Sequence, residues 1–123
     1  APSTGFSCFK QLFATGQSFS YNLNHIEHYY KHYLTLMDHW HSVYPEDVLT
    51  VNYENIVNDF ETHVKSIFSF LNLNFEEQCL SFHENKRAVA TASAEQVRQP
   101  INAKGLNAWQ PYSKYLQNLI EIK

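Results

Sequence analysis

Three histidines, His25, His28 and His32, follow one another at intervals of three and four residues. On a helix this spacing places the three imidazoles on one side, where their nitrogens could bind a transition metal. No cysteine or carboxylate close by in the sequence completes a metal site. We therefore interpret the three as a solvated polar face and predict no metal site.

Positive charge is concentrated in one segment. Between Lys86 and Lys104 there are four basic residues and a single acidic one, Glu95, whereas the whole chain has a formal net charge of −3. Residues 88–102 lose helical periodicity and are small, polar and basic, which is typical of a functional loop. The negative overall charge argues against nucleic acid as a partner.

A long amphipathic helix is predicted over residues 22–44. Its apolar residues recur with helical spacing, and Pro45 ends the pattern. We expect the histidines to lie on the side away from this apolar stripe. The stripe consists of Ile26, Tyr30, Tyr33, Met37, Trp40 and Tyr44.

Shorter elements surround this helix. Ser3 or Thr4 is expected to cap a helix over residues 6–13 that Gly16 ends, and Asn58 or Asp59 to cap another that ends near residue 72. Further helices are predicted over residues 75–83 and after Pro111. The β-branched run at residues 48–52 predicts one short strand. The expected fold class is therefore mainly α with one short strand.

Length and composition indicate one small globular domain, or part of one, over residues 1–123. Hydrophobic residues make up 44% and aromatic residues 15% of the chain, which excludes a disordered tail. Two cysteines, Cys8 and Cys79, are too few for a disulfide framework and favour reduced thiols in the cytoplasm. No apolar run approaches the length of a membrane span. The abrupt start suggests an excised fragment.

Three segments, in this order, resemble the C-terminal half of sulfotransferases that use 3′-phosphoadenosine 5′-phosphosulfate (PAPS), particularly the bacterial group related to tyrosylprotein sulfotransferases. The first segment is Ser7-Cys8-Phe9-Lys10-Gln11-Leu12-Phe13. The second is Leu36-Met37-Asp38-His39-Trp40 followed by Leu49-Thr50-Val51-Asn52-Tyr53-Glu54-Asn55-Ile56-Val57. The third, and most specific, is Thr91-Ala92-Ser93-Ala94-Glu95-Gln96-Val97-Arg98-Gln99-Pro100-Ile101, followed by Trp109 and Tyr112.

The resemblance implies part of an α/β nucleotide-binding fold whose central parallel sheet lies mostly outside these residues. It also implies PAPS, or its product adenosine 3′,5′-bisphosphate, as the cofactor. Ser7 matches a position that contacts the 3′-phosphate, Tyr53 an aromatic beside the nucleotide, and Ser93 and Arg98 the loop that closes over it. Taken without the resemblance, Ser7 is an ordinary helix residue, Tyr53 a core aromatic and Arg98 a solvated charge.

Two departures limit what the resemblance implies. The family's phosphate-binding loop and the Arg before the Ser7 segment are absent, so no residue of this chain is expected to be catalytic and the isolated chain is expected to be inactive. Ala108 stands where related enzymes often carry Arg or Lys, and Lys104 is a nearby substitute. His39 is a weak candidate for the base, because related enzymes place theirs elsewhere.

The sequence supports two candidate functions for this chain. The first is the nucleotide-binding C-terminal part of an enzyme that transfers a sulfuryl group from PAPS to a hydroxyl or similar acceptor, whose class the sequence leaves open. The alternative is a non-catalytic helical module that has lost its cofactor and forms a homodimer through its unpaired strand or exposed apolar faces.

Overall fold

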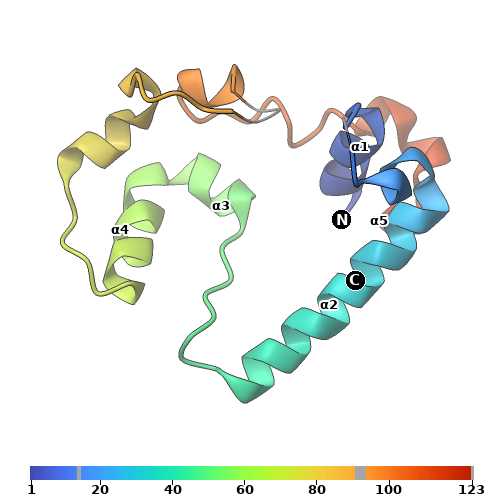
Figure 1. Ribbon diagram of the computed structural model, residues 1–123, viewed down its shortest axis with the longest axis horizontal. Helices are drawn as coiled ribbons and strands as arrows, with labels where there is room; N and C mark the ends of the chain where they lie inside the picture. The colour runs from blue at the N-terminus through green and yellow to red at the C-terminus, as the bar shows by residue number, and fades with distance from the viewer. Residues whose placement is uncertain (14, 91–93, 123) are drawn as a thin grey trace. The chain divides into compact units, whose positions relative to one another are not determined.

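The chain is mainly helical, as predicted. The computed structural model describes residues 1–13, 15–90 and 94–122, and within these ranges it contains helices and loops but no β-strand (Figure 1). The α-helices are α1 (Pro2–Lys10), α2 (Leu23–Val43), α3 (Tyr53–Asn58), α4 (Phe60–Phe70) and α5 (Gln117–Ile120). The 3₁₀ helices are η1 (Ser18–Tyr21), η2 (Glu77–Glu84), η3 (Gln96–Arg98) and η4 (Gln110–Tyr115).

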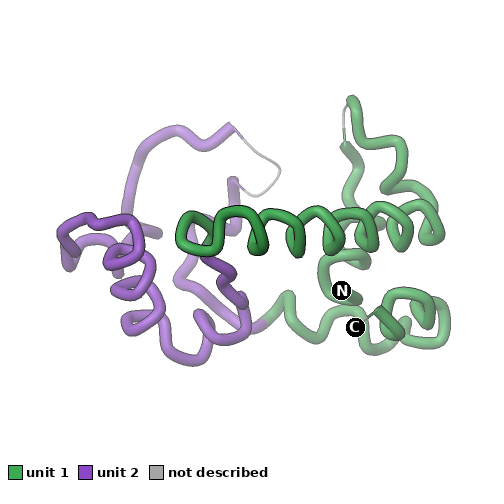
Figure 2. Tube along the Cα trace, turned by 90° about the horizontal axis from the view of Figure 1, so that it is seen from below, with its two compact units in different colours: residues 1–48, 104–123 green, residues 49–103 purple. Residues whose placement is uncertain are grey.

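The helices fall into two compact units. Unit 1 combines residues 1–48 with residues 104–123, and unit 2 consists of residues 49–103 (Figure 2). Unit 1 therefore joins the two ends of the chain, whereas unit 2 is continuous in sequence.

Unit 1 has a small core where α1, α2 and α5 meet. Ile26 of α2 and Leu116 and Leu119 at α5 are buried, and Leu119 is 0% exposed. Gly5 of α1 lies so close to this core that a Cβ on it would stand 2.5 Å from Cδ1 of Leu119. Glycine thus lets α1 approach α5 more closely than any other residue would. Phe6 of α1 also stacks on Tyr112, with ring centroids 5.0 Å apart.

Helix α2 confirms the predicted long helix. Its N-cap is Asn22, whose side chain accepts hydrogen bonds from the backbone N–H groups of Asn24 and His25. These bonds satisfy amide groups that have no partner inside the helix. Pro45 follows the last turn and lacks the N–H needed to continue the helix.

Unit 2 is held together by aromatic contacts. No residue within its described ranges is fully buried, but Phe60 packs on Phe82 at 5.6 Å and Phe68 on Phe75 at 5.7 Å between ring centroids. Asp59 caps α4 by accepting the N–H of Thr62, which confirms one of the two expected caps.

Asn72 ends α4, as the sequence suggested. It adopts a left-handed conformation, with φ of 53°, and the N–H of Leu73 donates to the carbonyl of Phe68. This is the Schellman pattern, in which a residue that tolerates positive φ closes the helix.

Two predictions about local structure are wrong. The run at residues 48–52 forms no strand, because the described part of the chain offers it no neighbouring strand with which to share hydrogen bonds. The first helix spans Pro2–Lys10 rather than residues 6–13, and neither Ser3 nor Thr4 caps it. Pro2 suits the first helical turn, and the Ser3 hydroxyl instead donates to the carbonyl of Leu106 at 2.7 Å.

Candidate functional site

Ser7 lies on the exposed side of α1. The hydroxyl makes no hydrogen bond with any residue that the structure describes. On the same helix, the Lys10 ammonium lies 5.4 Å from the ring centroid of Phe6. Unit 1 therefore presents a free hydroxyl and a cation on one short helix, both within reach of solvent.

Tyr53 begins α3 instead of ending a strand. Its side chain is 46% exposed, and its hydroxyl donates to the backbone carbonyl of Asn102 at 3.0 Å. The exposure argues against the interpretation of Tyr53 as a core aromatic. The hydrogen bond attaches the start of α3 to the basic loop segment 49 residues further along the chain.

Arg98 forms the end of η3, and its guanidinium group holds two backbone carbonyls. One N–H group donates to the carbonyl of Asn85 and another to the carbonyl of Arg87, the latter at 2.5 Å. The planar fork of a guanidinium suits two acceptors that lie close together. Arg98 therefore connects η3 to the segment that follows η2.

The structure brings Tyr53 and Arg98 into unit 2, where both attach to the segment between residues 85 and 102. Ser7 belongs to unit 1. Ser93 lies outside the described residues. In the structure, two of the four candidates therefore contact the same segment.

Asn85 was missed by the sequence analysis. Its carbonyl accepts from Arg98, and its side-chain oxygen accepts the N–H of Arg87 at 2.9 Å. An asparagine that bonds two residues ahead forms an Asx turn, a recognisable feature of polar segments such as Asn85-Lys86-Arg87. The basic residues Lys86 and Arg87 belong to this turn, next to the carbonyls that accept hydrogen bonds from Arg98.

These groups are chemically suited to bind an anion and an aromatic base. The guanidinium of Arg98 uses two of its donors on the backbone and keeps others for a further acceptor. Lys86 and Arg87, which are exposed, add positive charge to the same loop. A phosphate is held by such donors, and the exposed ring of Tyr53 offers a face for stacking.

A separate groove runs along α2 in unit 1. It has a volume of about 810 Å³ and is mainly apolar. Its lining residues are Phe19, Asn24, His25, His28, Tyr29, His32, Tyr33 and Leu36. Tyr33 belongs to the predicted apolar stripe, whereas His25, His28 and His32 belong to the side of α2 beyond that stripe. The histidine side and the stripe meet at this groove.

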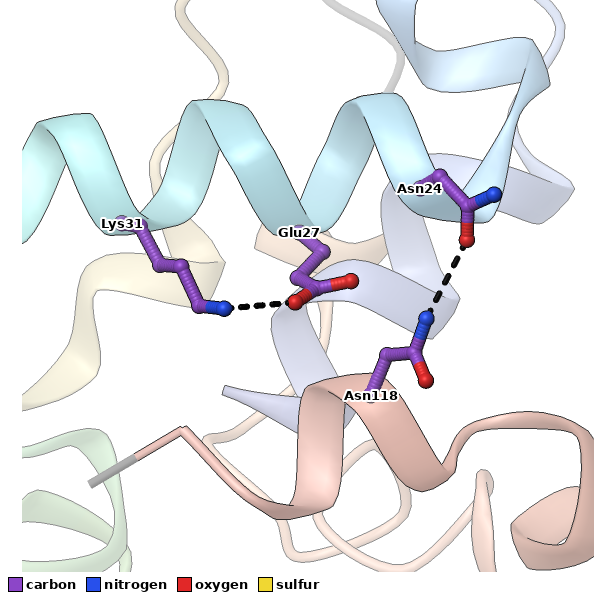
Figure 3. A network of polar contacts seen from close by, with 4 residues as sticks. All are labelled: Asn24, Glu27, Lys31 and Asn118. Atoms are coloured by element: carbon purple, nitrogen blue, oxygen red, sulfur yellow. Dashed lines mark hydrogen bonds and ion pairs between the residues drawn. The ribbon is translucent and has the colours of Figure 1, made fainter.

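Polar contacts link α2 to α5 beside the core (Figure 3). The Asn118 side chain donates to Oδ1 of Asn24 at 3.1 Å, and the Lys31 ammonium donates to Glu27 at 2.6 Å. The bond from Lys31 holds the pKa of the Glu27 carboxyl below its ordinary value, and Asn118 adds to the effect. Glu27 is thus the acidic centre of this network.

Metal clusters and membrane-spanning helices are two other features that could indicate a function. Among the described residues, no group of three or more His, Cys, Asp or Glu side chains is arranged to hold a metal ion. Of the helices formed by these residues, none has both the length and the hydropathy that a bilayer crossing requires.

Comparison with known proteins relates the sequence of this chain to one family. A model of the sulfotransferase family matches residues 1–77. An uncharacterized protein of Aquifex aeolicus (strain VF5) is 32% identical over 104 residues, which is 85% of this chain and 14% of that protein. The chain therefore spans a small part of this relative's length. No solved structure matches. Because the family model covers more than half of the chain, the chain belongs to the sulfotransferase family.

Proposed function

We propose that this chain is the C-terminal, nucleotide-binding part of a sulfotransferase that transfers a sulfuryl group from PAPS to a hydroxyl or similar acceptor. The observation that carries the proposal is the family match over residues 1–77. The resemblance to the bacterial group related to tyrosylprotein sulfotransferases, and the limited share of the Aquifex relative that the chain covers, support the assignment to one part of a longer enzyme.

The residues proposed to hold the nucleotide end of PAPS are Ser7, Ser93 and Arg98 for the phosphate and Tyr53 for the adenosine. Their chemistry fits these roles, because hydroxyl and guanidinium groups donate to phosphate oxygens and an aromatic ring stacks on a base. The exposed ring of Tyr53 and the spare donors of Arg98 support the fit in unit 2. PAPS supplies the sulfuryl group, and these residues bind and orient its other end.

The reaction breaks the S–O bond to the phosphate and forms an S–O bond to the acceptor, whose proton passes to a base. Donors that meet developing charge on the leaving phosphate contribute to such a transfer. Since this chain has no glycine-rich phosphate loop, we assign the base and the phosphosulfate contacts to other parts of the enzyme. Its own contribution is to hold the nucleotide in a fixed position.

The proposal is tested by calorimetric titration of the chain with adenosine 3′,5′-bisphosphate. Saturable binding is expected, and Ser7→Ala and Arg98→Ala should each weaken it by about 1.5–3 kcal/mol, as for a charge-assisted phosphate contact. Tyr53→Phe retains the stacking face and should bind nearly as well as the original chain, whereas Tyr53→Ala should bind more weakly.

Lys114→Ala is the matched control for loss of positive charge. The Lys114 ammonium lies over the ring of Tyr115, 4.7 Å from its centroid, and plays no part in the proposed site. If Lys114→Ala weakened binding as much as Arg98→Ala, the attraction would be general electrostatics rather than a defined site. A folded chain that binds no nucleotide would contradict a working half-site.

A second candidate is a non-catalytic module that forms a homodimer. Several large apolar side chains of α2 are exposed, among them Leu36 at 50% and Val43 at 48%. These exposed side chains recur along α2 with the a and d spacing of a coiled coil and so form an apolar seam. The charged residues Glu27, Lys31 and Asp38 lie outside this seam. Sedimentation equilibrium decides between the candidates: Leu36→Glu should abolish a dimer that forms through this seam.

A further inference from the structure

The strongest feature outside the proposed nucleotide contacts is a pair of histidines in the α2 groove. His28 and His32 lie one helical turn apart, and their Nε2 atoms are 2.9 Å from each other. Their rings meet edge to face, with centroids 4.4 Å apart and an angle of 78° between the planes. Both side chains are exposed. One Nε2 donates to the other, so both nitrogens point into the same small region.

The backbone beneath this pair is fixed. Both residues lie in the N-terminal half of α2, which the Asn22 side chain caps and which the core residue Ile26 anchors. A ligand that used both imidazoles would therefore not need to order the chain first. Preorganisation of this kind lowers the entropic cost of binding.

The surrounding groove shields one side of the pair. Tyr29, next to His28, stacks on Phe19 with ring centroids 4.2 Å apart and planes at 4°. Tyr33, next to His32, lines the same groove. These rings make the wall apolar, so an ion held by the imidazoles would be less exposed to water on that side.

The distance between the two nitrogens matches a chelate. Imidazole nitrogens bind divalent metals at about 2.0–2.1 Å. Two such bonds at a right angle place the nitrogens roughly 2.9 Å apart, whereas tetrahedral bonds place them about 3.3 Å apart. A right-angled pair belongs to square-planar or octahedral coordination, which Cu²⁺ and Ni²⁺ prefer.

We propose that His28 and His32 form a two-histidine chelate for Cu²⁺ or Ni²⁺. Both Nε2 atoms bind the ion, and the imidazole that now donates from Nε2 carries its proton on Nδ1 instead, so no net proton is released. Water or an external ligand fills the remaining coordination positions. The site is independent of the proposed sulfotransferase function.

The test is calorimetric titration of the tag-free chain with NiCl₂ and CuCl₂ in a buffer that does not bind metals. One saturable equivalent is expected for each ion. His28→Ala and His32→Ala should each weaken it by about tenfold or more, because each variant turns a chelate into a single ligand. The double variant should be little worse than either single variant, since the chelate is already lost.

His39→Ala is the control, because it removes a histidine from the same helix but outside the pair. It should leave the affinity unchanged. Alanine favours the helix, and circular dichroism should show that all four variants retain α2. MgCl₂ should not bind, since Mg²⁺ prefers oxygen ligands.

Three outcomes would overturn the proposal. The first is a wild-type chain that shows no saturable binding. The second is a His28→Ala or His32→Ala variant with unchanged affinity. The third is a His39→Ala variant that loses as much affinity as they do, which would assign the ion to scattered histidines.

Discussion

Arg98 illustrates how one side chain can hold a loop and still be available to a ligand. Its guanidinium donates to the carbonyls of Asn85 and Arg87, which lie 13 and 11 residues before it. Lysine carries the same charge but lacks the planar fork that reaches two acceptors at once. The structural role of Arg98 is therefore separable from its charge.

Replacing Arg98 with Lys should loosen the segment after η2 while conserving charge. We expect faster hydrogen exchange at the amides of residues 85–87, measured by mass spectrometry on peptides from unit 2. Arg87→Lys is the control, because the bond from Arg98 goes to the backbone carbonyl of Arg87, which this substitution retains. Equal exchange in the two variants would mean that the fork does not hold this segment.

Glu27 gives unit 1 a dependence on pH whose direction follows from its environment. The carboxyl has a lowered pKa in the folded chain, first because of the bond from Lys31. A group of this kind contributes stability above its unfolded pKa, and that stability is lost as pH falls through the folded pKa. Glu27→Gln should therefore flatten the acid side of the stability curve.

Urea unfolding at a series of acidic pH values measures this effect. The difference in midpoint between the original chain and Glu27→Gln should shrink as the pH falls below the ordinary range of a glutamate. Glu61→Gln breaks a similar ion pair, with Lys65 in α4 of unit 2, and serves as the comparison. A constant difference between the original chain and Glu27→Gln across all pH values would contradict the assignment to Glu27.

At the scale of elements, α2 and α3 both begin at an asparagine but use it differently. The Asn22 side chain accepts two backbone N–H bonds at the start of α2, whereas the Asn52 side chain makes no capping bond at the start of α3. Asn22 and Asn52 therefore form a matched pair for measuring how much a capping side chain contributes to the free energy of unfolding.

Asn22→Ala should lower the free energy of unfolding by about 1 kcal/mol, the usual cost of losing an N-cap. Asn52→Ala should change it far less, because no side-chain bond is lost there. Thermal unfolding followed at the helical circular dichroism band measures both variants. Equal effects would show that the Asn22 bonds do not stabilise α2.

At the scale of the whole molecule, unit 1 depends on the approach of α1 to α5. Its core has few fully buried residues, so each close contact among them has a large effect. A Cβ on Gly5 would stand against the Leu119 side chain and would also lie 3.3 Å from Cγ2 of Ile26. Since Leu119 is itself enclosed, its side chain has little room to move aside.

Gly5→Ala should therefore destabilise unit 1, although alanine favours a helix by about 1 kcal/mol. Overpacking of this kind costs about 1–3 kcal/mol, and we expect it to outweigh the gain in helix propensity. Gly105→Ala is the control, because a Cβ there would meet no atom within 4 Å. Denaturant unfolding of both variants gives the comparison.

A double variant makes this prediction specific. Leu119→Ala alone should cost about 2–5 kcal/mol through the cavity it leaves. In Gly5→Ala/Leu119→Ala the new methyl group can enter that cavity, so the double variant should lose less than the sum of the single losses. Additive losses would mean that the two residues do not compete for space.

The sequence by itself determined the helices whose hydrogen bonds are local. The apolar periodicity, Pro45, Asp59 and Asn72 predicted α2 and α4 correctly, because a helix needs only partners four residues away. Family membership was also readable from the order of three short segments, two of which lie within residues 1–77 that the family model matches.

Tertiary structure decided the features that depend on partners far apart in the chain. The run at residues 48–52 has the composition of a strand but forms none, because strand hydrogen bonds require a neighbour. The contacts of Gly5 with Leu119 and of Tyr53 with Asn102 likewise join distant positions. Periodicity describes one element at a time, and such contacts form only when elements pack together.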